Sequence, residues 1–471
     1  MSSSSTPESM LDPASGSSGA ESGSALWAPD RRVPTLALIL LVTLAAFEAM
    51  SVGTALPTLV AELGGQDLYS WPFTSFLAAS VIGTVLSGRV CDRLGPVPSL
   101  IVAPGLFFAG LVVAGVAENM WVLLLGRVLQ GAGAGAQIVA LYVMVALVYP
   151  ERDRPAAFGA LSAAWVVPSL VGPGLAGLAT ELLSWRLVFL GLAPLVLIGW
   201  LLLIPVVKTL RARPDTVPEQ SAEPRKGLPV AAVCAAVGLS ALTWAAEHPQ
   251  LSSLALGIGG LVLLAPSLRR LLPPGTLLGK PGLPVVVLSR GLLSGSFFAV
   301  QAYIPLVLAN VHGYSPTLAG VPLTVGSLGW SAAAAWQARQ RGVQSEVMIR
   351  RGFLLLAVAL AGAVLIAPAW GPAWLIYPLW AVAGFGMGTA MPNIAVRVLA
   401  LSTPNDRGFN GAAAQVCDMF GSAALIGLGG VLVGALASAG QPTAAVIPLD
   451  LVMAGFALLG AALISRNVRK V

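Results

Sequence analysis

Residues Leu123 to Gln137 read LLLGRVLQGAGAGAQ, an arginine and a ladder of Gly and Ala within a run apolar enough to cross a bilayer. A guanidinium near the middle of a hydrophobic span costs at least about 2.5 kcal/mol on insertion scales, so it usually faces a polar interior. Small residues at helix spacing let a neighbouring helix approach closely. The stretch therefore predicts a tightly packed transmembrane helix that carries a functional cation, Arg127.

The rest of the chain has the same apolar character. Of its 471 residues 56% are hydrophobic and 10% are charged, and the mean hydropathy is +0.85. Soluble domains carry roughly 25% charged residues, so a water-soluble fold is excluded. Apolar runs of roughly 18 to 25 residues recur, and alternating ten-residue strands do not. The sequence predicts an all-α polytopic membrane protein with fourteen spans between residues 34 and 465, including 156 to 180 and 288 to 311.

The charge distribution predicts the orientation of the spans. The net charge is +6, which the positive-inside bias of membrane loops explains without a nucleic-acid partner. With both termini in the cytoplasm, every Lys and Arg except Arg127 and Arg186 falls on a cytoplasmic loop, tail or helix end. Twelve spans would keep the same parity. The Ser/Gly-rich residues 1–30 lack a signal-peptide pattern and read as a disordered cytoplasmic tail.

An internal repeat divides the chain. Gly131, Gly133 and Gly135 recur 253 positions later as Gly384, Gly386 and Gly388, and Asp153-Arg154 recurs as Asp406-Arg407. The same offset places the start of the second repeat near residue 287, so the seventh and eighth spans form an inserted hairpin. We expect a tail (1–30), a six-helix half (31–207), a linker with the hairpin (208–283) and a second six-helix half (284–471).

The loop after the second span reads Gly88-Arg89-Val90-Cys91-Asp92-Arg93-Leu94-Gly95. It resembles G-x-x-x-D-R-x-G, the loop signature of the major facilitator superfamily, and the chain resembles the fourteen-span drug:proton antiporters within it. The basic residues that usually follow are replaced by Pro96 and Val97. The resemblance implies a conformational latch made of Gly88, Asp92, Arg93 and Gly95. We expect Asp92 to accept hydrogen bonds from the start of the thirteenth span near Arg407.

Two further stretches carry the resemblance. Arg127, Gln130, Gly131 and Gly133 match the fourth-helix signature R-x-x-Q-G-x-G. The fifth span resembles the antiporter signature G-x-x-x-G-P-x-x-G-G through Gly172, Pro173 and Gly177, with Pro168 and Ala176 at two glycine positions. A proline flanked by glycines bends a helix and permits close contact, which suits a hinge between moving halves.

The first span holds a carboxylate, Glu48. Glu48 to Pro57 resembles the first-helix signature D-x-T-x-x-N-x-A-L-P, with Glu in place of Asp. A carboxyl group in a low-dielectric environment can take up and release a proton as its neighbours change. We predict that Glu48 couples transport to protons and that Arg127 modulates it; a static ion pair is the alternative. The repeat places Gln301 and Trp380 at the corresponding positions of the second half.

Asp418 is the other carboxylate deep within a span. Together with Gln415 it is either a second proton or cation-recognition site or an interior hydrogen-bonding group. Several polar or aromatic residues on central helices are predicted to line a substrate cavity: Gln130, Gln137, Trp165, Gln301, Tyr303, Trp330, Asn393 and Gln415. Few polar groups in an apolar cavity favour a lipophilic or amphiphilic substrate.

These features predict a monomeric secondary transporter of a bacterial-type inner membrane and not an enzyme. Sequence patterns for zinc, phosphate-loop or nucleophile-elbow chemistry are absent, and the proton gradient takes the place of a cofactor. We expect proton-coupled export of lipophilic or cationic small molecules. A lipid or glycolipid exporter and a non-transporting sensor or scaffold are the alternatives.

Overall fold

The computed structural model describes residues 26–212, 227–248, 250–337, 339–340, 343–403, 406–436 and 444–468. Within these residues fourteen helical segments are long and apolar enough to cross a membrane, which confirms the predicted all-α polytopic class. Residues 1–25 of the predicted tail and 213–226 of the predicted linker lie outside them. The α-helices are α2 (Arg32–Leu63), α3 (Trp71–Leu94), α4 (Val97–Gly115), α5 (Met120–Val148), α6 (Arg154–Ala163), α7 (Val166–Leu182), α8 (Leu187–Leu190), α9 (Ala193–Arg211), α10 (Leu228–Glu247), α11 (Leu251–Leu271), α12 (Leu283–Asn310), α13 (Pro316–Gln337), α14 (Ser345–Ala363), α15 (Ile376–Ala400), α16 (Arg407–Leu436) and α17 (Val446–Val468).

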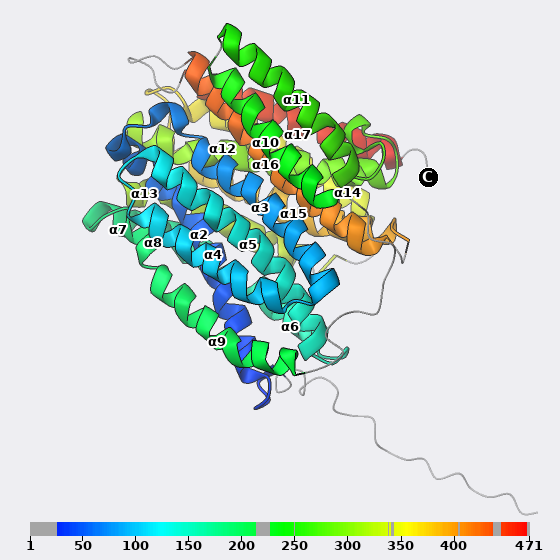
Figure 1. Cartoon of the computed structure of the whole chain (residues 1–471). Helices are drawn as coiled ribbons and strands as arrows, with labels where there is room; N and C mark the ends of the chain where they lie inside the picture. The colour runs from blue at the N-terminus through cyan, green and yellow to red at the C-terminus, as the bar shows by residue number, and fades with distance from the viewer. Residues whose placement is uncertain are drawn as a thin grey trace, which may run out of the picture.

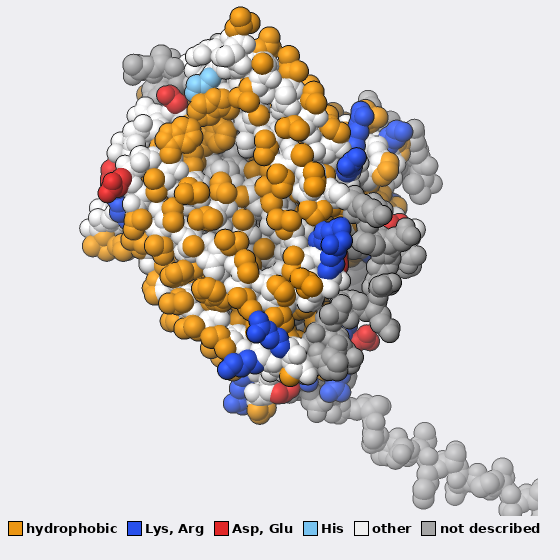
Figure 2. Space-filling view, viewed as in Figure 1, with side chains coloured by type: hydrophobic (Ala, Val, Ile, Leu, Met, Phe, Trp, Pro, Cys, Tyr) orange, Lys and Arg blue, Asp and Glu red, His pale blue; other side chains and the backbone are white. Residues whose placement is uncertain are grey.

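The two ends of the bundle differ in charge. Hydrophobic side chains cover the middle of the molecule, Lys and Arg gather toward the lower right of the view, and His and acidic groups lie at the upper left (Figure 2). We call the first end the basic face, where Arg89, Arg152, Lys208 and Arg269 lie. The other end is the acidic face, with Glu62, Asp67, Glu118 and Glu181.

The glycine ladder packs the two halves in the same way. A Cβ atom on Gly131 of α5 would meet the backbone carbonyl of Phe76 in α3, and one on Gly384 of α15 would meet that of Gly326 in α13. On the other side of each ladder helix, Gly133 faces α4 and Gly386 faces α14. Only a residue without a side chain fits these contacts. The repeat seen in the sequence is therefore a repeat of helix packing.

The halves meet along two seams. α3 packs against α16 at one seam and α7 packs against α13 at the other, while α2 and α12 also touch. The hairpin formed by α10 and α11 lies against α3 and α16, on the outside of the first seam (Figure 1). Its two helices pack closely through Gly238 and Gly260.

The fifth predicted span is not one continuous helix. The structure breaks 156 to 180 into α6 and α7 at Ala164 and Trp165. Pro168 has no backbone N–H to donate to the carbonyl four residues earlier, at Ala164, so the helix loses a hydrogen bond there. The break places Trp165 at the junction of the two helices.

Candidate functional site

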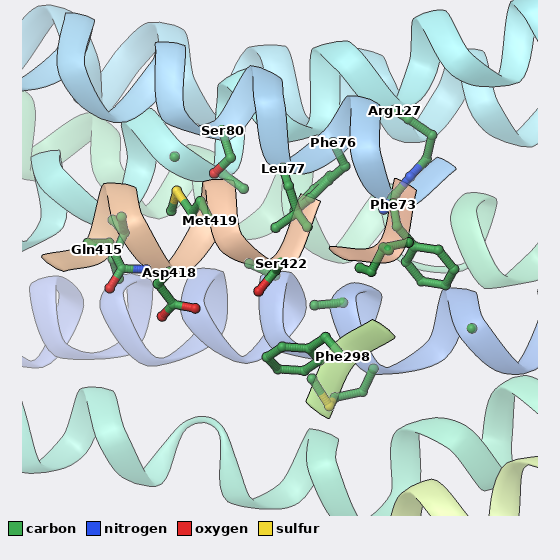
Figure 3. A pocket seen from close by; sticks show the side chains of 18 of the residues that line it. Phe73, Phe76, Leu77, Ser80, Arg127, Phe298, Gln415, Asp418, Met419 and Ser422 are labelled. Carbon is green, nitrogen blue, oxygen red and sulfur yellow. The ribbon is translucent and has the colours of Figure 1, made fainter. Parts of the chain in front are cut away.

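A cavity of about 320 Å³ lies between the two halves. Figure 3 shows Arg127 with Phe73 at one end and Gln415 with Asp418 at the other, with Phe76 and Phe298 between them. Most of the wall is apolar. Its polar members come from both halves: Ser80, Arg127, Gln137, Gln301, Gln415, Asp418 and Ser422.

Arg127 is held by a buried network at the first end of the cavity. Its Nη1 donates to Glu48 and, at 2.5 Å, to the side-chain oxygen of Gln130, and its Nε donates to the carbonyl of Pro72 at 2.9 Å. The guanidinium lies 4.4 Å from the centre of the Phe76 ring. The side chains of Arg127 and Glu48 are 2% and 0% exposed. Charges taken this far out of water are stable only when paired, so the two residues depend on each other.

The network is not fully satisfied. Glu48 Oε2 and Gln130 Nε2 are buried without a hydrogen-bond partner. An unpartnered carboxylate oxygen beside the ion pair is a place where a proton can bind without displacing another donor. Arg127 forms part of the cavity wall, whereas Glu48 lies behind it. A change in the cavity at Arg127 therefore reaches Glu48 through direct contact.

The second half contains a neutral version of this pair. Trp380 Nε1 donates to the side-chain oxygen of Gln301 at 3.3 Å, and these residues stand 253 positions after Arg127 and Glu48. The indole fits because a glycine, Gly326, lies beside it; Gly384 contacts Gly326 as Gly131 contacts Phe76, so Phe76 is the packing counterpart of Gly326 in the first half. The fold thus needs a hydrogen bond between these helices but does not need charge.

A second ion pair lies toward the basic face. Arg290 of α12 donates from Nε to Asp418 at 3.2 Å and from Nη2 to Gln415 at 2.8 Å, both on α16. The sequence reasoning missed Arg290 because it counted this residue as a helix end. In the structure it lies inside α12, which begins at Leu283. Its position inside the predicted span 288 to 311 was the available signal.

The predicted cavity residues divide into two groups. Gln137, Trp165, Gln301 and Gln415 line the cavity, and the Gln137 side chain also donates to the carbonyl of Leu41 at 3.2 Å. The other four predicted residues are not part of this cavity's lining in the present conformation, and their side chains contact other partners: Gln130 contacts Arg127, Tyr303 contacts Tyr69, Trp330 contacts Phe297, and Asn393 contacts Gln337.

The halves are joined near the acidic face. Tyr69, two residues before the start of α3, donates its hydroxyl to the carbonyl of Ala302 at 3.1 Å, and its ring lies 5.3 Å from that of Tyr303. At the other seam, Thr317 donates its hydroxyl to Glu181 at 2.6 Å. These contacts close the cavity toward the acidic face.

The predicted latch is not engaged. Asp92 and Arg93 are exposed at the end of α3, and within the described residues Asp92 makes no hydrogen bond or salt bridge, including the one expected near Arg407. A Cβ atom on Gly88 would meet nothing within 4 Å, so the close helix approach expected there is also absent. Gly95 has a φ of +75°, which explains the glycine at this turn. The joined acidic face accounts for the difference, because this latch lies at the other end of the bundle.

The predicted hinge residues lie at a seam between the halves. Pro173 is inside α7, and a Cβ atom on Gly177 would meet the backbone of Thr317 in α13. Gly172 faces Ser51 and Met50 of α2. The small residues of α7 thus allow both halves to approach this helix. Among the described residues, no group of three His, Cys, Asp or Glu side chains could hold a metal ion.

Two packed helical halves with a cavity between them are the architecture of many secondary transporters. A model of the Major Facilitator Superfamily matches residues 38–426. An uncharacterized MFS-type transporter of Mycobacterium tuberculosis is 30% identical over 355 residues, covering 72% of this chain and 50% of that protein. An efflux pump of Gibberella moniliformis is 26% identical and covers 69% of this chain and 60% of the pump.

Solved structures have the same fold. An auto inhibited POT family peptide transporter superposes with a TM-score of 0.70 at 17% identity, over 93% of this chain and 97% of that one. A human organic anion transporter gives a TM-score of 0.60 at 16% identity, over 93% and 100%. The chain spans about half the length of the Mycobacterium relative. The chain belongs to the Major Facilitator Superfamily, whose members here are transporters and not enzymes.

Proposed function

We propose that this protein exports lipophilic or cationic small molecules in exchange for protons, as a monomer in an inner membrane with the basic face in the cytoplasm. The positive-inside rule supports this orientation. Relatives described as efflux pumps support the direction of transport. The observation that carries proton coupling is the buried Glu48–Arg127 pair, whose neutral counterpart in the other half serves the same packing without charge.

The geometry supports a sign for the coupling. A proton on Glu48 neutralises the carboxylate and leaves the positive charge of Arg127 uncompensated in the cavity wall. A cationic substrate is then repelled, whereas it is tolerated when Glu48 is ionised. Proton and cation thus exclude each other, as exchange requires. The proposed transport cycle is alternating access, in which the cavity opens to one face and then to the other. Protonation also shifts the populations of these two conformations, because it weakens a bond between α2 and α5.

The cavity supports the substrate class. Phenylalanine rings and methionines, among them Phe298, Met50 and Met419, form an adaptable apolar wall. Asp418 is the one carboxylate among its lining residues and is an attractive partner for a cation. Arg290 competes for it, which limits how tightly a cation is held and so favours release.

Flux in reconstituted vesicles tests the proposal. Ethidium and a fluorescent phospholipid are supplied to the same proteoliposomes with and without a pH gradient. We expect the gradient to drive ethidium and not the phospholipid. Gradient-driven movement of the phospholipid alone would replace the proposal with lipid export. Gradient-independent flux of both, with folded protein, would contradict proton coupling, and absence of flux of both would favour a sensor or scaffold.

A further inference from the structure

Helix α10 spans the outside of the seam between α3 and α16 near the acidic face. Toward α16 its Thr243 and Glu247 lie on glycines: a Cβ atom on Gly427 would meet Thr243, and one on Gly430 would meet the Glu247 carboxylate. These glycines are one helical turn apart, so they present a flat stripe to α10. The stripe brings Glu247, the last residue of α10, to the seam itself.

Glu247 reaches across the seam to the first half. Its carboxylate accepts a hydrogen bond from Ser70 Oγ at 3.0 Å and from Trp71 Nε1 at 2.6 Å. The preceding residue, Tyr69, bonds to Ala302 in the second half. One short segment, 69–71, is thus bonded both to the second half and to the hairpin, so separating α3 from α16 at this end must break both contacts.

Aromatic rings hold the end of α10 in place. Trp244 lies 5.7 Å from Trp71 and 5.8 Å from Trp121 of α5, measured between ring centres, and His248 stacks on it at 4.1 Å. The other seam has a different closure, in which Glu181 accepts directly from Thr317. At the first seam, the hairpin therefore adds a contact that links α10 to both α3 and α16.

The negative charge of Glu247 is not required to pack the end of α10. Both donors are neutral, and within the described residues Glu247 forms no salt bridge. A glutamine would have the same number of partners, accepting from Trp71 and donating to Ser70, but without charge assistance. The titratable groups that act on it are His248 in the next position, Asp67 in the short 3-10 helix before α3, and the buried hydroxyls of Tyr69 and Tyr303. None of these is a fixed cation, so the carboxylate is open to a proton from the acidic face.

We propose that Glu247 controls the outer gate, by which we mean the contact between α3 and α16 at the acidic face. Its carboxylate acts as a second latch: it binds Ser70 and Trp71 and holds the hairpin against this contact while the cavity is closed toward the acidic face. A proton arriving from that face releases it. The carboxylate accepts two hydrogen bonds, and protonation weakens both because they lose their charge assistance. The latch assumes the alternating access of the proposed function. It assigns to the inserted hairpin a role in gating and to Glu247 a positioning role outside the cavity.

Gate opening is measured by pulsed electron paramagnetic resonance on the full chain. Spin labels at Gln66→Cys and Leu436→Cys report the latched seam, and labels at Leu183→Cys and Leu318→Cys report the other seam, after Cys91, Cys234 and Cys417 are replaced by alanine. Distances are recorded at pH 7.5 and pH 5 for the wild type, Glu247→Gln and Glu118→Gln. Glu118 is the matched control because it is an exposed acid of the same face.

We expect Glu247→Gln to raise the open fraction at the latched seam about tenfold at pH 7.5, the worth of a charged hydrogen bond, and to abolish its response to pH. The wild type at pH 5 should resemble this variant, and Glu118→Gln should resemble the wild type. Trp71→Phe, which removes one donor and keeps the carboxylate, should open the gate partly and keep the pH response. A Glu247→Gln protein with wild-type distances at both pH values, or one that still responds to pH, would overturn the latch. The distances are measured without a transported substrate, so the result of this test does not depend on whether the protein exports molecules in exchange for protons.

Discussion

Trp380 and Gln301 form a neutral hydrogen bond of 3.3 Å at the positions that the internal repeat places opposite Arg127 and Glu48. One helix contact, repeated between the halves, therefore exists in two chemical forms in the same molecule. The neutral form shows what the architecture requires, and the charged form shows what has been added. This comparison within one chain is the physical basis for assigning Glu48 a role beyond packing.

The first prediction concerns variants in which residues of the first half are replaced by the uncharged residues found at the corresponding contact of the second half. Glu48→Gln alone leaves Arg127 buried without its partner, which we expect to cost about 3–5 kcal/mol. The combination Glu48→Gln, Arg127→Trp and Phe76→Gly copies Gln301, Trp380 and Gly326, and should recover most of that loss. Thermal unfolding in detergent measures the difference. A combination no more stable than Glu48→Gln would show that the two sites are not structurally interchangeable.

The second prediction concerns Asp418 and Arg290. Asp418→Asn leaves Arg290 as an uncompensated cation beside the cavity, so ethidium should bind at least about tenfold more weakly. Arg290→Gln frees the carboxylate, so ethidium should bind more tightly. Fluorescence titration checks both, with neutral Nile red as the control. Equal changes for the two dyes would mean that the ion pair acts only through stability.

The third prediction tests the close approach of α7 and α13. Gly177→Val places side-chain atoms against the backbone of Thr317 and should destabilise the closed acidic face by about 1–3 kcal/mol. Gly174→Val is the matched control, because a Cβ atom on Gly174 meets nothing within 4 Å. We expect only Gly177→Val to increase labelling of a cysteine placed in the cavity from the acidic side. Equal labelling of both variants would argue against Gly177 as the contact that sets this seam.

Sequence reasoning predicted the helical class and the repeat, because span length and the glycine ladder are local patterns. It also predicted that Glu48 and Arg127 could meet, since their depths in two spans follow from residue count. It also predicted that Tyr303 lines the cavity, whereas the cavity of this conformation does not include Tyr303 in its lining. Helix α12 is apolar on every side and buried against several helices, so its periodicity does not reveal which side faces the cavity.

The sequence also does not predict which side chains far apart in the chain become partners. Arg290 and Asp418 are 128 residues apart, and nothing local to either residue identifies the other. The break at Trp165 has a different cause. Pro168 stands at a glycine position of the fifth-helix signature, which does not predict a break, but its ring nitrogen cannot donate a hydrogen bond to the carbonyl of Ala164. The unengaged latch at Asp92 reflects conformation, which a sequence shared by both states does not specify.

The central claim, that Glu48 carries the coupled proton, is tested most directly by ethidium transport into proteoliposomes under a pH gradient, with counterflow of neutral Nile red measured in parallel. We predict that Glu48→Gln retains Nile red counterflow, because the cavity remains, and loses ethidium accumulation driven by the gradient, because a neutral residue 48 leaves Arg127 to repel the cation at every pH. Full gradient-driven accumulation by Glu48→Gln would contradict the account.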